Sequence, residues 1–135
     1  MLLDVNLINM LGGWNERLAI DCVDDYICLK AERLNIERYI FGECKLTHRL
    51  GIPKTINFHG HIINLRNDNP SRLYSIYKSH VMICRLYPEA KAYRKEAFTF
   101  WSKTCINVLL FEKNRVKKGI AILSGIFAGL FCKVT

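Results

Sequence analysis

The stretch that decides the fold is NDNPSRLYSIYKSHVMICRLY, residues 67–87. It opens with a breaker, because Asn, Asp, Pro and Ser in succession favour a turn over regular structure. From Pro70 the apolar and aromatic side chains recur every three or four residues, at Leu73, Ile76, Tyr77, His80, Val81, Cys84 and Tyr87. That spacing is the period of an α-helix with one buried face. We therefore expect a helix to begin near residue 70 and the chain to divide into parts 1–68 and 69–135.

Two further helices are expected after this one. Pro88 interrupts the pattern, a second helix is predicted over 89–111, and a third contains the uncharged run GIAILSGIFAGLFC, residues 119–132. As a helix that run would be about 21 Å long, which is short of the roughly 30 Å hydrocarbon core of a bilayer. Four basic residues precede it, at Lys113, Arg115, Lys117 and Lys118. Two interpretations stay open: an element lying in the membrane interface, or a buried C-terminal helix with a solvated basic turn.

The part before residue 67 mixes helix and strand signals. Asp4 is a plausible N-cap for a short helix that Gly12-Gly13 would end. The other expected elements are a helix from Asp24 to about Asn35, strands over 36–41 and 44–48, and a hairpin of 55–58 and 61–65 across His59-Gly60. The predicted fold class is thus α+β, with short strands and two helices followed by two or three basic amphipathic helices.

The net charge of +8 is unevenly distributed along the chain. Residues 1–70 carry eight Lys/Arg against nine Asp/Glu, whereas residues 71–135 carry twelve against three. A basic half of this kind predicts an anionic partner, either lipid or nucleic acid. Nucleic acid is less favoured, because no helix-turn-helix, zinc-finger or RNP-like motif accompanies the charge. The six cysteines form no CxxC pair, which favours a reducing compartment over a disulfide framework.

The residues with the most chemical potential lie between Gly12 and His48. Taken alone, each has a plain structural role open to it: Asp24 or Asp25 as an N-cap, Trp14 as a core residue, and His48 as a structural imidazole at a strand end. His59 and His61 lie two apart with no third ligand near in sequence, so a zinc site there is not expected.

Read together, four segments resemble family 2 glycosyltransferases, and in particular bacterial rhamnosyltransferase-like members that build cell-surface polysaccharide. The segments are GGWNERLAIDCVDDYICLKAERLN (12–35), CKLTHRLG (44–51), PSRLYSIYKSH (70–80) and KKGIAILSGIFAGLFCKVT (117–135). The sequence departs from the family pattern at Asn15, where Asp is usual, at Lys30, where Arg is usual, and at Cys132, where Gly is usual.

The resemblance implies the second half of a GT-A catalytic domain, at residues 1–68, followed by a helical tail. The nucleotide-binding half is expected to be missing, so the chain is expected to be inactive or weak alone. Three interpretations stay open: a truncated reading frame, a gene remnant, or one part of a split enzyme whose donor-binding half is on a separate chain. By position, Asp24 corresponds to the catalytic base, and Trp14 would line the acceptor pocket. Glu16, Asp21 and Asp25 would contact the substrate, and His48 would reach the metal or the diphosphate. The complete enzyme is expected to use Mg or Mn, a nucleotide-sugar donor and a glycan or lipid-linked acceptor.

The basic tail suits a membrane surface, and the expected location is cytoplasmic, peripheral at the inner face of the cell membrane. By their charge, seven residues are expected to face that surface: Arg72, Lys78, Arg85, Lys91, Arg94, Lys95 and Lys103. The competing hypothesis is a non-catalytic basic protein that binds membranes or nucleic acid. Sugar transfer that is lost on replacing Asp24 would distinguish the glycosyltransferase hypothesis from this competing one.

Overall fold

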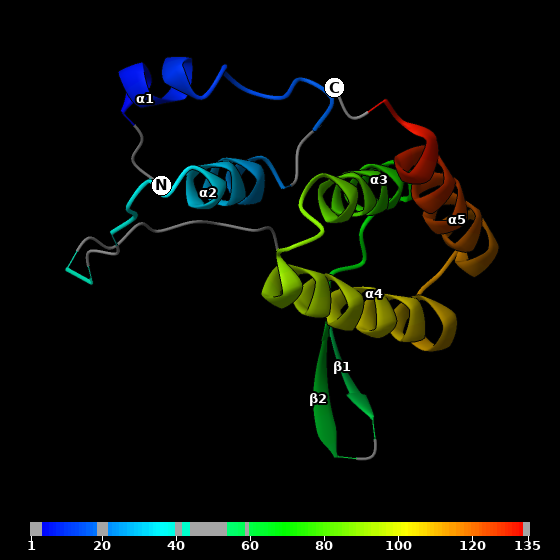
Figure 1. The fold of residues 1–135 in the computed structure, drawn as a ribbon. Helices are drawn as coiled ribbons and strands as arrows, with labels where there is room; N and C mark the ends of the chain where they lie inside the picture. Colours follow the sequence, from blue (N-terminus) through cyan, green and yellow to red (C-terminus); the bar gives the residue numbers. More distant parts are fainter. Residues whose placement is uncertain (1–3, 19–21, 40–41, 44–53, 59, 134–135) are drawn as a thin grey trace.

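The computed structural model describes residues 4–18, 22–39, 42–43, 54–58 and 60–133. These residues form five α-helices and one two-stranded antiparallel sheet, which confirms the α+β class (Figure 1). The elements are α1 (Val5–Met10), α2 (Val23–Arg33), β1 (Lys54–Phe58), β2 (His61–Leu65), α3 (Pro70–Leu86), α4 (Lys91–Phe111) and α5 (Arg115–Phe131).

The predicted start and end of α1 are confirmed. The Asp4 carboxylate accepts a hydrogen bond from the backbone N–H of Asn6 at 2.8 Å, as an N-cap does. Gly12 and Gly13 both have positive φ, at 78° and 76°, and the Gly13 N–H donates to the Ile8 carbonyl at 2.9 Å. Glycine is suited to this left-handed conformation, which ends the helix.

The predicted hairpin is also confirmed. β1 and β2 pair antiparallel with Ile56 opposite Ile63. Gly60 takes φ +83°, and its N–H donates to the Asn57 side chain at 3.0 Å, which fixes the turn. In Figure 1 the hairpin projects from the helices below α4.

The strand predicted over 36–41 is wrong for its described residues, 36–39, which form no strand. The segment turns back onto α2 instead: the Ile36 N–H donates to the Ala31 carbonyl at 2.9 Å, and Arg38 pairs with Glu32 at 2.8 Å. A strand needs a neighbour to satisfy its backbone groups, and this segment bonds locally to the end of the helix. The strand predicted over 44–48 lies outside the described residues.

The three helices of the second part form as the sequence predicts. Asn69 caps α3 by accepting from the Arg72 N–H at 2.8 Å, and Pro70 takes the first helical position. The helix expected from residue 89 begins at Lys91, as α4. α5 packs along α3 at close range, because Gly125 and Gly129 face α3 and are buried (Figure 1).

Two hydrophobic clusters hold the molecule together. The first joins α1, the following turn, α2 and α3, and includes Ile8, Leu11, Leu18, Tyr26, Ile27, Met82, Ile83 and Tyr87. The second joins α3, α4 and α5, and comprises Leu73, Ile76, Tyr77, Val108 and Ile122. Because α3 contributes to both clusters, the two predicted parts of the chain are packed against one another.

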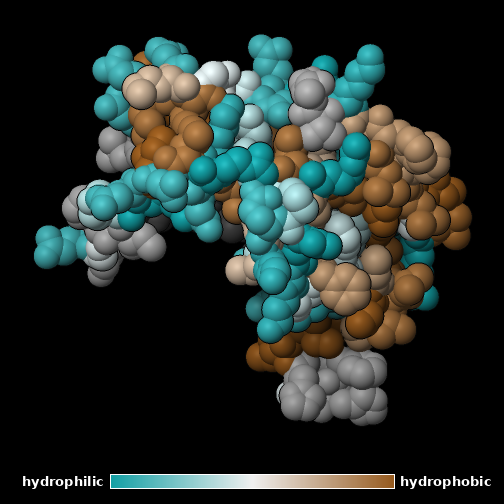
Figure 2. Space-filling view, viewed as in Figure 1, coloured by the Kyte–Doolittle hydropathy of each residue, from teal (hydrophilic) through white to brown (hydrophobic). Residues whose placement is uncertain are grey.

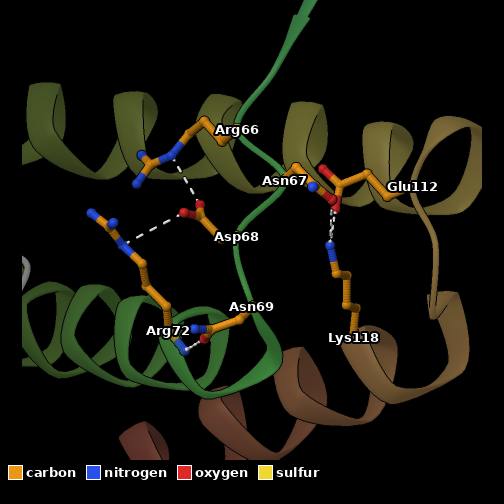
Figure 3. A network of polar contacts seen from close by, with 7 residues as sticks. All are labelled: Arg66, Asn67, Asp68, Asn69, Arg72, Glu112 and Lys118. Carbon is orange, nitrogen blue, oxygen red and sulfur yellow. Dashed lines mark hydrogen bonds and ion pairs between the residues drawn. The ribbon is translucent and has the colours of Figure 1, made fainter. Parts of the chain in front are cut away.

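A polar network fixes the end of the hairpin to the helices (Figure 3). The Lys118 ammonium lies 2.6 Å from the Glu112 carboxylate and 3.1 Å from the Asn67 side-chain oxygen. Lys118 and Glu112 are both buried, so Lys118 does not belong to the solvated basic cluster predicted at 113–118. Asp68 pairs in turn with Arg66 at 3.0 Å and with Arg72 at 3.5 Å.

Within the described part of the chain, no helix combines the length and the apolar character that crossing a bilayer requires.

Candidate functional site

Two of the four predicted site carboxylates, Asp24 and Asp25, lie in the first turn of α2. Cys22 takes the N-cap position with φ +70° and makes no side-chain cap hydrogen bond, so neither Asp24 nor Asp25 is the N-cap. Both aspartates are exposed. Negative side chains here are favourable, because the backbone N–H groups give the helix start a partial positive charge. The start of α2 therefore presents two accessible carboxylates at a defined helix position.

α2 is anchored both by Tyr26, next to the acidic turn, and by Arg33, its last residue, which holds the acidic turn in place. The Arg33 side chain donates to the Glu89 carboxylate at 2.8 Å and to the Leu86 carbonyl. Its guanidinium carbon lies 4.1 Å from the centre of the Tyr87 ring, and Tyr26 meets Tyr87 edge-on at 6.1 Å. These contacts fix α2 to the turn between α3 and α4.

The start of α2 lies beside α4 at Tyr93. Burial raises the pKa of the Tyr93 hydroxyl, and the neighbouring Cys22 and Asp25 raise it further by disfavouring a second negative charge. Cys84 of α3 adds to the same effect. The acidic turn is therefore in electrostatic contact with the helical tail, a proximity that no pattern in the sequence indicates.

Trp14 and Glu16 lie in the turn between α1 and α2. Trp14 is 50% exposed, so it is not the core residue that its size would suggest, and Glu16 is exposed as well. Lys30 of α2 approaches this turn: a Cβ added to Gly12 would lie 3.7 Å from the Lys30 Nζ. Among the described residues, no hydrogen bond, ion pair or ring contact joins Trp14 or Glu16 to Asp24. Their convergence on one sugar site stays a prediction.

Asp21 and His48, the other two predicted site residues, lie outside the described residues. Across the ranges that the structure describes, no group of three or more His, Cys, Asp or Glu side chains could hold a metal ion. The expected Mg or Mn stays a prediction, since such ions are often held by one or two carboxylates together with substrate phosphates.

A basic groove that sequence reasoning missed lies between α3, α4 and α5. Its volume is about 670 Å³, and four cationic side chains line it: Arg85, Lys91, Arg94 and Lys95. Its other walls are largely apolar and include Phe98, Trp101 and Leu130. The sequence predicted that these four residues face an anionic surface. It did not predict that three helices place them around one groove.

Comparisons with known proteins identify no relative of this chain. No protein-family model, curated protein or solved structure matches the chain. The resemblance to family 2 glycosyltransferases therefore stays a prediction from sequence motifs, and any function proposed for the chain rests on it together with the geometry of the described residues.

Proposed function

We propose that the chain is the acceptor-side part of a glycosyltransferase resembling family 2. It would act in transfer of a sugar such as rhamnose from a nucleotide-sugar donor to a glycan or lipid-linked acceptor. The site of action would be the cytoplasmic face of the cell membrane, where cell-surface polysaccharide is assembled. A donor-binding half would supply the nucleotide site.

The observation that supports this function best is the placement of Asp24. A base for sugar transfer has to be accessible to the acceptor and held in a fixed position. Asp24 is exposed, yet it sits on a helix that Arg33 and Tyr26 anchor at several points. Asp25, beside it, interacts with Tyr93 of the helical tail, so the two aspartates have different surroundings and Asp24 is the better candidate to meet a substrate.

In the proposed transfer, the Asp24 carboxylate takes the proton of the acceptor hydroxyl as that oxygen forms a bond to the anomeric carbon of the donor sugar. The bond from that carbon to the diphosphate breaks, and the nucleoside diphosphate leaves with the electron pair. The half-exposed face of Trp14 suits packing against the apolar side of a sugar ring, and Glu16 can accept a hydrogen bond from an acceptor hydroxyl.

The helical tail would hold this site at the membrane surface. α5 leaves a row of large apolar side chains exposed, and Figure 2 shows the patch over this helix. Basic residues lie at its start and in the groove beside it. An apolar face next to basic residues is typical of helices that lie in the membrane interface.

Sugar transfer by two closely related variants tests the proposal. The chain is combined with the nucleotide-binding half of a family 2 glycosyltransferase, and transfer of labelled sugar is measured. Asp24→Asn removes the base and should lower the rate by about 10²–10⁴-fold. Glu32→Gln removes the same charge from an exposed position at the far end of α2 and should leave the rate unchanged. Equal rates for Asp24→Asn and the unmodified chain would remove Asp24 from the role of base.

A non-catalytic membrane-surface protein is the second candidate, because the exposed apolar face of α5 would serve it equally well. The same pair of variants separates the two functions. Such a protein would bind vesicles and show no transfer with any donor-binding half.

A further inference from the structure

The exposed side chains of α5 form a continuous apolar stripe. Val116, Ile120, Leu123, Phe127, Leu130 and Phe131 recur every three or four residues, with one adjacent pair at the end, and are 48–76% exposed. The opposite face of the helix is buried on α3, where a Cβ at Gly125 would lie 2.5 Å from the Tyr74 carbonyl oxygen. The stripe therefore points away from the core for the whole length of the helix, as the brown surface in Figure 2 shows. Such patches mark interaction sites.

The basic groove adjoins this stripe. Leu130 belongs to both, and Phe98 of α4, which is also exposed, lines the groove together with it. Among the described residues, no Asp or Glu lines the groove, so its four cations share it with no acidic side chain. One hollow thus offers a cationic wall and an apolar wall, and the apolar wall continues onto an exposed hydrophobic surface.

Two of the cations are held by the backbone and two are available to a ligand. The Arg85 guanidinium donates to the Gly129 carbonyl at 2.8 Å and to the Cys132 carbonyl at 3.0 Å, so it is held at the end of α5. Arg94 donates to the Pro88 carbonyl at 3.2 Å. Lys91 and Lys95 lie one turn apart on α4, are exposed, and form no ion pair with any described residue.

The position of Lys91 is unfavourable unless an anion is bound. Lys91 is the first residue of α4, which has no side-chain cap hydrogen bond and no acidic residue in its first turn. Cations are unfavourable at a helix start, whereas an anion there is favoured. A phosphate group accepts charge-assisted hydrogen bonds from Lys and Arg, and so matches this wall of the groove.

We propose that the groove between α3, α4 and α5 binds the phosphate headgroup of an anionic membrane lipid, while the α5 stripe lies among the acyl chains. The inference rests on the membrane part of the proposed function and is independent of sugar transfer. It makes this protein select anionic lipids through a built site, rather than through its net charge alone.

Vesicle flotation of the full chain tests the inference. The probes are phosphatidylcholine vesicles with and without phosphatidylglycerol. Lys91→Gln/Lys95→Gln removes two groove charges, and Lys54→Gln/Arg38→Gln removes two exposed charges outside the groove. Removing one lysine from the headgroup should weaken binding by about fivefold, so the groove pair should bind phosphatidylglycerol vesicles about 25-fold more weakly. The second pair of substitutions should weaken binding much less, because these side chains attract the membrane only at long range and contact no headgroup in the groove.

Three results would overturn the inference: equal weakening by the two pairs, equal binding to the two kinds of vesicle, or no binding to either. A fourth is self-association of the free chain, by light scattering, that Leu123→Ser/Phe127→Ser abolishes, because the stripe would then be covered by a second copy. Circular dichroism checks that all variants fold. Sugar transfer to a soluble acceptor should persist in the groove pair, so failure here is distinguishable from failure of the proposed function.

Discussion

Replacing Gly125 by Ala should force α5 away from α3. The added Cβ would lie 2.5 Å from the Tyr74 carbonyl oxygen and 3.2 Å from its carbonyl carbon, both backbone atoms that cannot swing aside. Overpacking of this kind costs about 1–3 kcal/mol. Alanine returns up to about 1 kcal/mol of helix propensity. We expect a net decrease of about 1–2 kcal/mol in the free energy of unfolding.

Gly119→Ala in the same helix provides the control. A Cβ at Gly119 meets no atom within 4 Å, so only the propensity gain remains. This variant should be more stable by about 0.5–1 kcal/mol. Urea unfolding followed by circular dichroism measures both. If Gly125→Ala proves as stable as Gly119→Ala, the close packing of α5 on α3, and with it the outward direction of the stripe, is wrong.

Two further predictions concern buried polar groups. Lys118→Met leaves the buried Glu112 carboxylate without its cation and should cost about 3–5 kcal/mol in urea unfolding; Lys118→Met/Glu112→Leu should recover most of that stability, and no recovery would mean that the pair is not coupled. Burial raises the pKa of Tyr87 to about 12, from 10.0. Because the folded state then holds this proton more tightly than the unfolded state does, stability should fall as the pH rises from about 10 to 12. In Tyr87→Phe, alkaline unfolding should show a shallower fall, and an unchanged slope would refute the assignment.

The elements that the sequence predicted are those with local signals. The helix at α3 is delimited by Asn69-Pro70 before it and Pro88 after it, and its apolar period lies between them. The hairpin follows from Gly60 between two alternating segments. In both cases the contacts that fix the bounds of the element join residues close in sequence, so the sequence pattern alone predicts the element.

The features that the sequence did not predict depend on how segments pack. The strand expected over 36–41 is wrong for its described residues, 36–39, because a strand requires a partner and these residues return to α2. Cys22, in a left-handed conformation that is rare outside glycine, occupies the N-cap position of α2 where an aspartate was expected, and it makes no side-chain cap hydrogen bond. Lys118 looked solvated, but it is buried against Glu112, six residues earlier across a turn.

The candidate site likewise has features that follow from local sequence and features that follow only from packing. The position of Asp24 in the first helical turn follows from its neighbours, and the structure shows its side chain exposed. The proximity of Asp25 to Tyr93, which is far along the chain, and the groove formed by three helices follow only from packing. Whether Trp14 and Asp24 face one substrate stays a prediction for the same reason.

Titration of the isotope-labelled chain with a soluble oligosaccharide released from bacterial surface polysaccharide, followed by nuclear magnetic resonance, tests the sugar-facing site most directly. We predict that the largest backbone amide shifts fall together at Trp14, Glu16 and Asp24, and that Asp24→Asn leaves the shifts at Trp14 in place, because binding does not require the base. Shifts confined to one of these positions, or spread over the α5 stripe instead, would contradict a shared sugar-binding surface.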